Sequence, residues 1–243
     1  MPSKALAGET KCCAHRGTSS THPENTVAAF EEAVRLGVDM IEFDVGTTAD
    51  GRAVLLHDGT VDRTTNGSGA LHELTFEQVR ALDAGSHLDA KFAGEKIPTL
   101  EEALDAIPPG IVLNVHVKPT PGVVDETAAI LTDTGRIGDA VLAGDADRIR
   151  RCQEVCPSLR TCNLGGQGKD DYLDLCIELG VPWLQYFHAQ VTDESVAAAH
   201  ERGMVVNCFY ANDEAEMRRQ IDCGVDYILT DHAQVLMRVL GRA

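Results

Sequence analysis

ENTVAAFEEAVRLGVDMIEFDV, residues 24–45, contains a helix pattern followed directly by a strand pattern. In the first half, apolar residues recur at the spacing of one helical face: Val27, Phe30, Ala33 and Val34. Gly37 then gives a typical helix end, and Met40–Val45 is a short apolar run of strand length. A helix that leads straight into a strand is the unit from which parallel sheets are built.

The same alternation continues along the rest of the chain. Eight runs predict strands, and a helix-like segment follows each: Lys11–Ala14, Met40–Val45, Ile111–Lys118, Ala140–Ala143, Arg160–Asn163, Trp183–Phe187, Met204–Phe209 and Asp226–Leu229. Eight such units in 243 residues match an α/β fold of the (β/α)₈ type, the TIM barrel. The alternative is a doubly wound open sheet, which usually carries a glycine-rich phosphate turn after its first strand. No such turn follows Lys11–Ala14.

One segment, Gly46–Pro98, interrupts this alternation. It contains a hairpin turn signal at Asp50-Gly51, a glycine-rich stretch at 66–69 and a short helix pattern. We interpret it as an insertion after the second strand, above the C-terminal mouth of the barrel, and as too short and too polar to hold a core of its own. The expected organisation is a single barrel domain over residues 1–243, with 46–98 inside it.

Composition and charge exclude several classes of protein. Hydrophobic residues make up 44% and charged residues 24%, which is ordinary for a globular chain. With 21 Lys+Arg against 38 Asp+Glu the net charge is −17, so we expect no nucleic-acid partner. No apolar run approaches the ~18 residues that span a bilayer, so we expect no membrane insertion.

The expected compartment follows from the N-terminus and the cysteines. Met1–Thr10 lacks the apolar segment of a secretory signal. The eight cysteines include no CxxC pair and no metal-ligand spacing. We therefore expect reduced thiols and a cytoplasmic location.

The second predicted strand carries two carboxylates. Side chains alternate along a strand, so Glu42 and Asp44 share one face, while Ile41, Phe43 and Val45 share the other. Two carboxylates side by side on a buried strand are costly unless a cation neutralises them. The alternative is an ion-paired couple on an exposed edge, which the apolar residues of the opposite face disfavour.

The hairpin turn predicts where a histidine lies relative to these carboxylates. A two-residue loop at Asp50-Gly51 pairs Ala49 with Arg52, and counting back places Asp44 opposite His57. Opposed residues have Cβ atoms about 5 Å apart. The strand is therefore expected to overshoot the barrel rim and fold back, which brings His57 to the mouth.

The third predicted strand repeats the polar pattern. In 113–119, Asn114, His116 and Lys118 share one face and valines the other. A lone buried histidine is more often a satisfied core group than a metal ligand. The carboxylates on the neighbouring strand favour a ligand role for His116, and both interpretations stay open here.

These residues form one predicted constellation: His15, Arg16, Glu42, Asp44, His57, His116 and Lys118. Two carboxylates and an imidazole can bind a divalent metal, two histidines can act as general acid and base, and two cations can hold an anion. This set suits the cleavage of a phosphodiester.

A series of short motifs along nearly the whole chain resembles the glycerophosphodiester phosphodiesterase family. The motifs are His15-Arg16-Gly17, Pro23-Glu24-Asn25-Thr26, Glu42-Phe43-Asp44-Val45, Asp50-Gly51, His57-Asp58, Arg63-Thr64-Thr65-Asn66-Gly67, Leu82-Asp83-Ala84-Gly85, Ile97-Pro98-Thr99-Leu100, Gly224-Val225-Asp226 and Thr230-Asp231. The resemblance implies a phospholipase-C-like (β/α)₈ barrel and metal-dependent hydrolysis of glycerophosphodiesters to glycerol 3-phosphate and an alcohol. It also implies that the catalytic pair is His15 and His57.

The resemblance assigns the other site residues as well. Glu42 and Asp44 would bind the metal, and Arg16 and Lys118 would contact phosphate. The family usually has Glu where His116 stands. One divalent ion is expected, Mg or Ca by resemblance, while an imidazole ligand also admits Mn or Zn.

Two further departures concern the alcohol part of the substrate. Phe209, followed by Tyr210, stands where the family usually has Trp, and a frequent Ser-Phe is replaced near Ala143-Gly144. We interpret Trp183, Tyr186 and Phe187 as ordinary barrel packing, and a pocket wall near the substrate is the alternative. Asp231 is interpreted as a helix cap.

Other functions remain compatible with this pattern. A related phosphodiesterase of the same barrel type could act on a lysophospholipid or a cyclic phosphate. A non-catalytic binding module is a third possibility, which the presence of both His15 and His57 disfavours. A small-molecule phosphodiester is the expected partner, and the sequence leaves the oligomeric state open.

Overall fold

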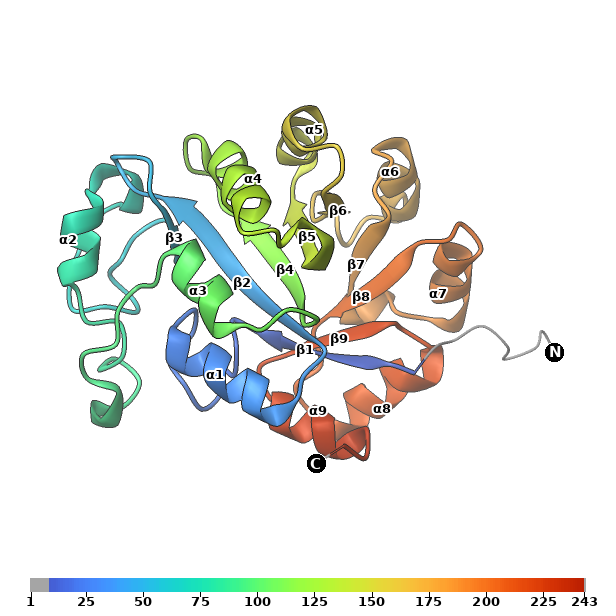
Figure 1. The fold of residues 1–243 in the computed structure, drawn as a ribbon. Helices are drawn as coiled ribbons and strands as arrows, with labels where there is room; N and C mark the ends of the chain where they lie inside the picture. The colour runs from blue at the N-terminus through green and yellow to red at the C-terminus, as the bar shows by residue number, and fades with distance from the viewer. Residues whose placement is uncertain (1–8, 243) are drawn as a thin grey trace.

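The computed structural model describes residues 9–242. A nine-stranded sheet forms its centre, and eight of the strands run parallel: β1 (Lys11–His15), β2 (Met40–Thr47), β4 (Val112–Val117), β5 (Ala140–Gly144), β6 (Arg160–Asn163), β7 (Trp183–Phe187), β8 (Val205–Phe209) and β9 (Tyr227–Thr230). The order is β1-β9-β8-β7-β6-β5-β4-β2, and β1 also pairs with β2. This last pairing closes the sheet, so the fold is the predicted (β/α)₈ barrel and the open sheet is excluded (Figure 1).

Helices between the strands form the outer ring (Figure 1). They are α1 (Val27–Leu36), α3 (Leu100–Ala106), α4 (Val123–Asp133), α5 (Ala146–Val155), α6 (Tyr172–Glu178), α7 (Asp193–His200), α8 (Glu214–Cys223) and α9 (Ala233–Val239), with short 3₁₀ turns at Ile137–Asp139 and His188–Gln190. Local sequence explains their ends. Thr26 caps the first turn of α1 and Gly37 ends it at φ 72°, while Thr99 and Glu102 form a capping box on α3.

Strand alternation divides the apolar residues into two layers. Ile41, Phe43 and Val45 point outward and pack, fully buried, in the large cluster beneath the helices. A second cluster fills the barrel interior: Cys13, Met40, Val141, Ala143, Cys162, Trp183, Tyr227 and Leu229. The interior is therefore closed by packed side chains, and polar residues occur towards the C-terminal ends of the strands.

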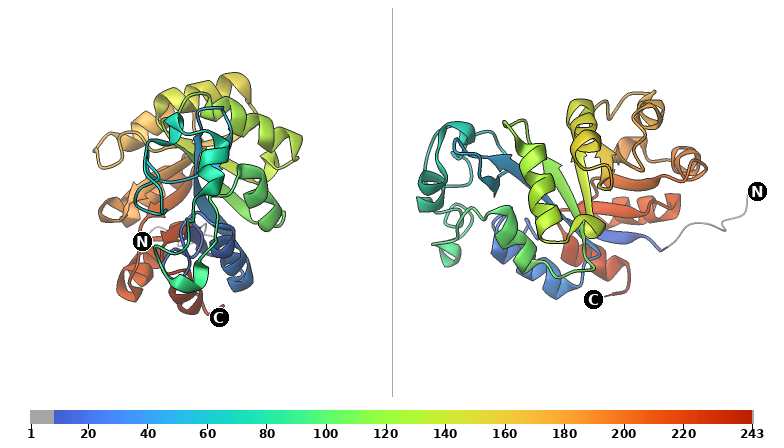
Figure 2. Two further views of the ribbon diagram at one scale, coloured as in Figure 1. Left: turned by 90° about the vertical axis from the view of Figure 1, so that its left-hand side faces the viewer. Right: turned by 45° about the horizontal axis from the view of Figure 1, so that its top comes forward.

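The segment 46–98 leaves the barrel at the C-terminal end of β2 and lies in front of the barrel in the left view of Figure 2. It contains β3 (Ala53–Leu55), α2 (Phe76–Ala81) and 3₁₀ turns at Leu71–Glu73 and Ala90–Phe92. The expectation that it is too polar for a core of its own is wrong. It encloses a separate cluster of buried apolar residues: Val54, Leu56, Val61, Leu71, Val79, Ala84 and Ile97.

The predicted hairpin register is also wrong. β3 runs antiparallel to β2 with Thr47 opposite Ala53, so the loop is one residue longer than predicted. Gly51, at φ 82°, donates its N–H to the carbonyl of Thr48 at 2.9 Å, and this places a left-handed residue after the turn. The slip brings Leu56, not His57, opposite Asp44, whose carbonyl accepts the Leu56 N–H at 3.1 Å.

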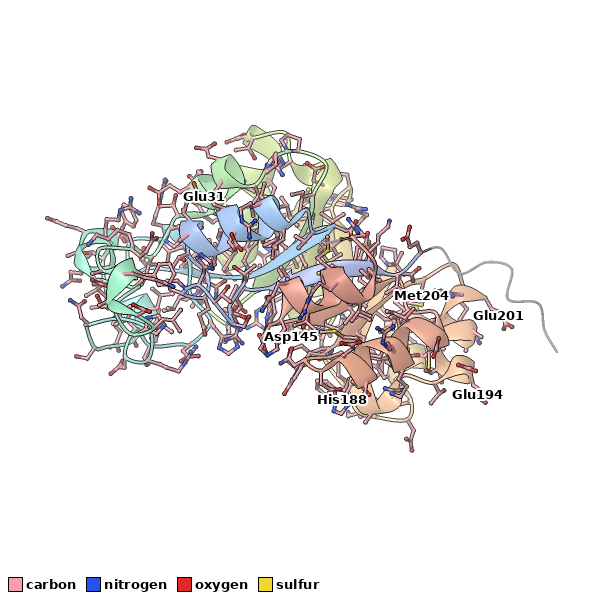
Figure 3. The ribbon with its side chains drawn as sticks, turned by 90° about the horizontal axis from the view of Figure 1, so that it is seen from below. Glu31, Asp145, His188, Glu194, Glu201 and Met204 are labelled. Carbon is pink, nitrogen blue, oxygen red and sulfur yellow. The ribbon has the colours of Figure 1, made fainter. Side chains whose placement is uncertain are left out.

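Most cysteines lie in the protein interior, and acidic side chains lie on the outer helices. All eight cysteines lie within the described chain and are free thiols, and seven of them are buried. Acidic side chains are spread over separate outer helices, as Glu31 on α1 and Glu194 and Glu201 at α7 illustrate (Figure 3).

Across residues 9–242, no helix has both the length and the apolar character needed to cross a bilayer. The expectation of no secretory signal concerns Met1–Thr10, of which residues 1–8 lie outside the described part of the chain.

Candidate active site

A pocket of about 300 Å³ opens at the C-terminal ends of the barrel strands. Its lining comprises His15, Arg16, Glu42, Asp44, His57, Asn114, His116, Ala143, Leu164, Gln167, Gln185, Phe187, Phe209 and Leu229. Six of the seven predicted site residues are in this lining, and the exception is Lys118. The C-terminal face is where barrel enzymes place their reacting groups.

The turn after β1 connects this strand to the carboxylates. Arg16 has a positive φ of 53°, and its N–H donates to Oε2 of Glu42 at 3.0 Å. Gly17 follows at φ 77°, and a Cβ there would lie 2.7 Å from the Cβ of Ala29. Only glycine fits this approach of the turn to α1, which explains why glycine follows His15 and Arg16.

Asp44 is fully buried and surrounded by donors. Its Oδ2 accepts from Asn25 Nδ2 at 2.9 Å and lies 3.4 Å from Arg16 Nε. Its Oδ1 lies 2.9 Å from Lys118 Nζ and 3.1 Å from His116 Nδ1. Burial acts to raise the pKa of Asp44, but His116 and Lys118 outweigh it and hold the pKa well below its usual range.

The pKa of Glu42 is shifted in the opposite direction to that of Asp44. Burial and the charge of Asp44 raise the pKa of Glu42. One atom from each of Glu42, Asp44 and His116 lies within 4.8 Å of the others. Two buried carboxylates that repel each other beside an imidazole are a donor set that a divalent cation would stabilise.

Lys118 lies on the Asp44 side of this cluster. Its Nζ is 3.5 Å from His116 Nδ1 as well as 2.9 Å from Asp44, and its side chain is only 13% exposed. The Lys118 ammonium group therefore forms an ion pair with Asp44 and is not part of the pocket lining.

His15 is positioned by a residue that we interpreted differently from the sequence. Its Nδ1 lies 2.7 Å from Oδ1 of Asp231, at the end of β9. The interpretation of Asp231 as a helix cap is wrong, because His232 occupies the N-cap position of α9 and no side chain caps this helix. Burial acts to lower the pKa of His15, but the Asp231 hydrogen bond and the Glu42 charge outweigh it and raise the pKa.

His57 comes from the insertion and has a carboxylate partner of its own. Its Nδ1 lies 2.6 Å from Asp58 Oδ1, and Arg63 donates to the other oxygen of Asp58 at 2.6 Å. Arg63 lowers the pKa of Asp58 to about 2. Burial lowers the pKa of His57 against the opposing charges of Asp44 and Asp58.

Glu24 joins the insertion to the barrel. It accepts from Arg63 at 2.8 and 2.9 Å and from Arg16 at 2.9 Å. Sequence reasoning assigned no role to Glu24, Asn25 or Arg63, although all three occur in motifs of the family resemblance. Their roles depend on contacts between loops that no local pattern contains.

The opposite wall of the pocket is apolar. Phe209 packs edge-on against His15 with ring centroids 5.6 Å apart, and Phe187 lies 6.0 Å from Phe209. Phe187 therefore lines the pocket, whereas Trp183 belongs to the barrel interior and Tyr186 to the layer under the helices. The aromatic residues of β7 thus divide between the pocket and ordinary packing.

Comparison with known proteins gives consistent matches. Residues 15–235 match the model of the glycerophosphoryl diester phosphodiesterase family. The glycerophosphodiester phosphodiesterase of Caldanaerobacter subterraneus subsp. tengcongensis is 32% identical over 240 residues, which cover 96% of this chain and 99% of that protein. Glycerophosphodiester phosphodiesterase 1 of Mus musculus is 54% identical over 93 residues, 37% of this chain and 28% of that protein.

Solved structures match with similar coverage. The structure of an Oleispira antarctica phosphodiesterase in complex with the product sn-glycerol-3-phosphate has a TM-score of 0.86, 25% identity, and coverage of 95% of this chain and 96% of that chain. A glycerophosphodiester phosphodiesterase from Agrobacterium tumefaciens has a TM-score of 0.85, 27% identity, and coverage of 94% and 99%.

The barrel, the pocket and these matches together define an enzyme of the phosphoric diester hydrolase class. Within this class, the chain belongs to the glycerophosphoryl diester phosphodiesterase family.

Arg63→Ala removes the ion pairs with Glu24 and Asp58, which for a half-exposed arginine are worth about 1 kcal/mol. We expect this loss to appear as poorer positioning of His57, which lowers kcat/KM by about fivefold. The change frees Asp58 and loosens the insertion near His57. The control is Arg150→Ala, which removes an exposed ion pair with Asp147 away from the pocket. Equal kcat/KM values for the two variants would contradict a role for Arg63 in the site.

Proposed function

We propose that this enzyme hydrolyses glycerophosphodiesters to glycerol 3-phosphate and an alcohol in the pocket at the barrel mouth. The observation that carries the proposal is that two histidines, each with a carboxylate at Nδ1, line one pocket with the Glu42–Asp44–His116 cluster. The names of the matched relatives and the product held by the Oleispira antarctica enzyme support the choice of substrate.

We propose that Glu42, Asp44 and His116 bind one divalent metal ion. The raised pKa of Glu42 and the mutual burial of the two carboxylates fit this role, because a cation would relieve their repulsion. A bound divalent ion would supply charge neutralisation for the phosphate oxygens. Mg or Ca fits the two carboxylates, while an imidazole ligand also admits Mn or Zn.

In this proposal, His15 and His57 transfer the protons of the reaction. One imidazole accepts a proton from the attacking hydroxyl as the new bond to phosphorus forms. The other donates a proton to the alkoxide as the bond between phosphorus and the alcohol oxygen breaks. The attacking hydroxyl is that of water, whose oxygen stays on phosphorus. The first imidazole then releases its proton to solvent and the second takes one up, which restores the starting protonation state.

Arg16 is the cation that we propose to contact the phosphate, because it lines the pocket beside His15 and Lys118 does not. That Lys118 also contacts phosphate remains a prediction, since its amine is engaged by Asp44. The apolar wall around Phe187 and Phe209 would then face the organic part of the substrate.

The direct test measures glycerol 3-phosphate released from a series of glycerophosphodiesters, after chelation and after addition of single metals. We expect no release after chelation and recovery with at least one divalent ion. Lysophospholipid and a cyclic glycerophosphate are the competing substrates. Faster turnover of either one would favour the related phosphodiesterase, and no turnover with any metal would favour a binding module.

We predict that His116→Glu retains activity and shifts the metal preference towards Mg or Ca, the ions that favour oxygen ligands. His116 is 30% exposed and 3.5 Å from Lys118, so a carboxylate at this position would pair with Lys118. If the metal binds there, it offsets the repulsion by Glu42 and Asp44, and we expect a small stability cost with metal present. The measurement compares activity with each metal and melting temperatures for both proteins. An unchanged metal preference with a large loss of stability would contradict the ligand role.

A further inference from the structure

The pair formed by His15 and Asp231 is connected to a second layer of fixed donors. Ser19 Oγ also donates to Oδ1 of Asp231, at 2.9 Å, and Asn212 Nδ2 donates to Oδ2 at 2.6 Å. Among the described residues, His15 is the only ion-pair partner of Asp231. The carboxylate thus accepts hydrogen bonds from His15, Ser19 and Asn212. Of these three donors only the imidazole can carry a positive charge that pairs with it.

The orientation of the Asn212 amide is determined by its other contacts. Its Oδ1 accepts from Thr230 Oγ1 at 3.1 Å and from the N–H of Asp231 at 2.9 Å. The oxygen therefore faces the backbone, and Nδ2 must face Asp231. Asn212 accordingly requires an acceptor at Oδ2 of Asp231, which a carboxylate provides.

The proton on His15 can be assigned from the same contacts. A carboxylate oxygen only accepts hydrogen bonds, so Nδ1 of His15 carries a hydrogen. Nε2 is then the nitrogen that faces Glu42, 3.8 Å away, at the pocket. The neighbouring Phe209 ring packs edge-on against the imidazole and restricts its rotation.

We propose that Asp231 is a positioning residue that, with Asn212 and Ser19, holds His15 as the Nδ1–H tautomer with Nε2 presented to the phosphodiester. The inference rests on the proposed function for its kinetic consequence but not for the tautomer itself. An imidazole in this state can accept a proton at Nε2 or, once protonated, return it.

The sharpest variant is Asp231→Asn. Asn212 would attract the new amide oxygen, which turns the new NH₂ group towards His15 and makes Nδ1 an acceptor. We expect His15 to change to the Nε2–H tautomer and kcat to fall by about 10²-fold, with KM little changed. Ser19→Ala, which removes one of the donors, should cause a smaller fall.

A second exchange should repair the hydrogen bonds. In the double variant Asp231→Asn with Asn212→Asp, the carboxylate introduced at position 212 accepts from the NH₂ group introduced at position 231. The amide oxygen at position 231 then faces Nδ1 of His15 again. We expect the Nδ1–H tautomer to return and kcat to recover in part, although the negative charge beside His15 is lost. A role in folding alone would not produce this recovery.

The matched control is Asp226→Asn. Asp226 forms the same kind of pair with His200, at 2.9 Å, but precedes β9 and lies at the opposite end of the barrel. We expect this variant to keep kcat, whatever stability it loses. A fall equal to that of Asp231→Asn would overturn the proposal.

Long-range ¹H–¹⁵N spectra of histidine-labelled protein report the tautomer without any substrate. The metal-free wild type, at an alkaline pH where His15 is neutral, should show Nδ1–H for His15, and Nε2–H in the wild type would overturn the inference even if every variant failed to fold. Unchanged kcat in a folded Asp231→Asn variant would also overturn it. If the wild type released no glycerol 3-phosphate, the proposed function would fail while the tautomer test still stood.

Discussion

Replacing His57 with alanine should lower the turnover of glycerophosphodiesters by about 10²- to 10⁴-fold, which is the contribution of a general acid or base. His57 belongs to the pocket lining, and its side chain is 35% exposed. Its removal therefore leaves little empty space and little stability is lost. The measurement is kcat with the preferred metal, together with the melting temperature.

The matched control for this variant is His72→Ala. His72 lies in the same insertion but is exposed and outside the pocket lining. We expect its replacement to leave kcat unchanged. If His57→Ala retained near-normal kcat, His57 would have no part in proton transfer, and the acid–base pair would have to be sought elsewhere in the pocket.

Asp44→Asn should have the largest combined effect on activity and stability. The fully buried carboxylate is the common partner of Arg16 and Lys118. Its loss removes the carboxylate that neutralises Lys118, while Arg16 keeps its ion pair with Glu24. Removing one member of a buried ion pair costs about 3–5 kcal/mol. Relief of the repulsion by Glu42 offsets part of this, so we expect a loss of about 3 kcal/mol and roughly 10 °C in melting temperature.

The pH dependence of this loss has a definite sign. The folded pKa of Asp44 is lowered, so its stabilisation is fully present above the unfolded pKa of about 3.9 and disappears as pH falls through the folded value. Chelator-treated wild type and Asp44→Asn should therefore differ most near neutral pH and converge in acid. A constant difference in melting temperature down to strongly acidic pH would contradict the ionised state of Asp44.

Activity separates the proposed metal-binding role of Asp44 from its role in stability. We expect no measurable turnover by Asp44→Asn at temperatures where the variant is folded. Asp39→Asn is the control, because Asp39 is ion-paired with Arg242 just before β2, at the end of the barrel away from the pocket. Asp39→Asn should lose stability and keep turnover when folded.

Periodicity was sufficient to predict the barrel, since each parallel strand is a local apolar run and closure follows from having eight of them. The face shared by Glu42 and Asp44 was equally predictable, because strand alternation is a local property. The register of β3 could not be predicted, because one extra loop residue, Ala49, shifts the pairing without changing the turn signal at Asp50-Gly51. His57 nevertheless lies at the pocket because it follows β3 and is outside the ladder.

The support of the two histidines could not be predicted from local pattern. Asp231 has the same sequence signal as a helix cap, a short acidic residue before a helix, and only the three-dimensional arrangement brings it to His15. Arg63 and Glu24 are 39 residues apart, and nothing in either segment indicates their contact. Contacts between side chains of separate loops produce no periodic pattern in a single sequence, so local pattern cannot predict them.

The hydrogen bond between His15 and Asp231 joins residues 216 positions apart. A ribosome therefore adds Asp231 to the growing chain 216 residues after His15. A nascent chain that stops before β9 lacks both Asp231 and the strand that pairs with β1, so neither closure nor the support of His15 is possible. We expect catalytic competence to arise only after β9 and Asp231 have left the exit tunnel, and products of translation interrupted before Asp231 to be inactive.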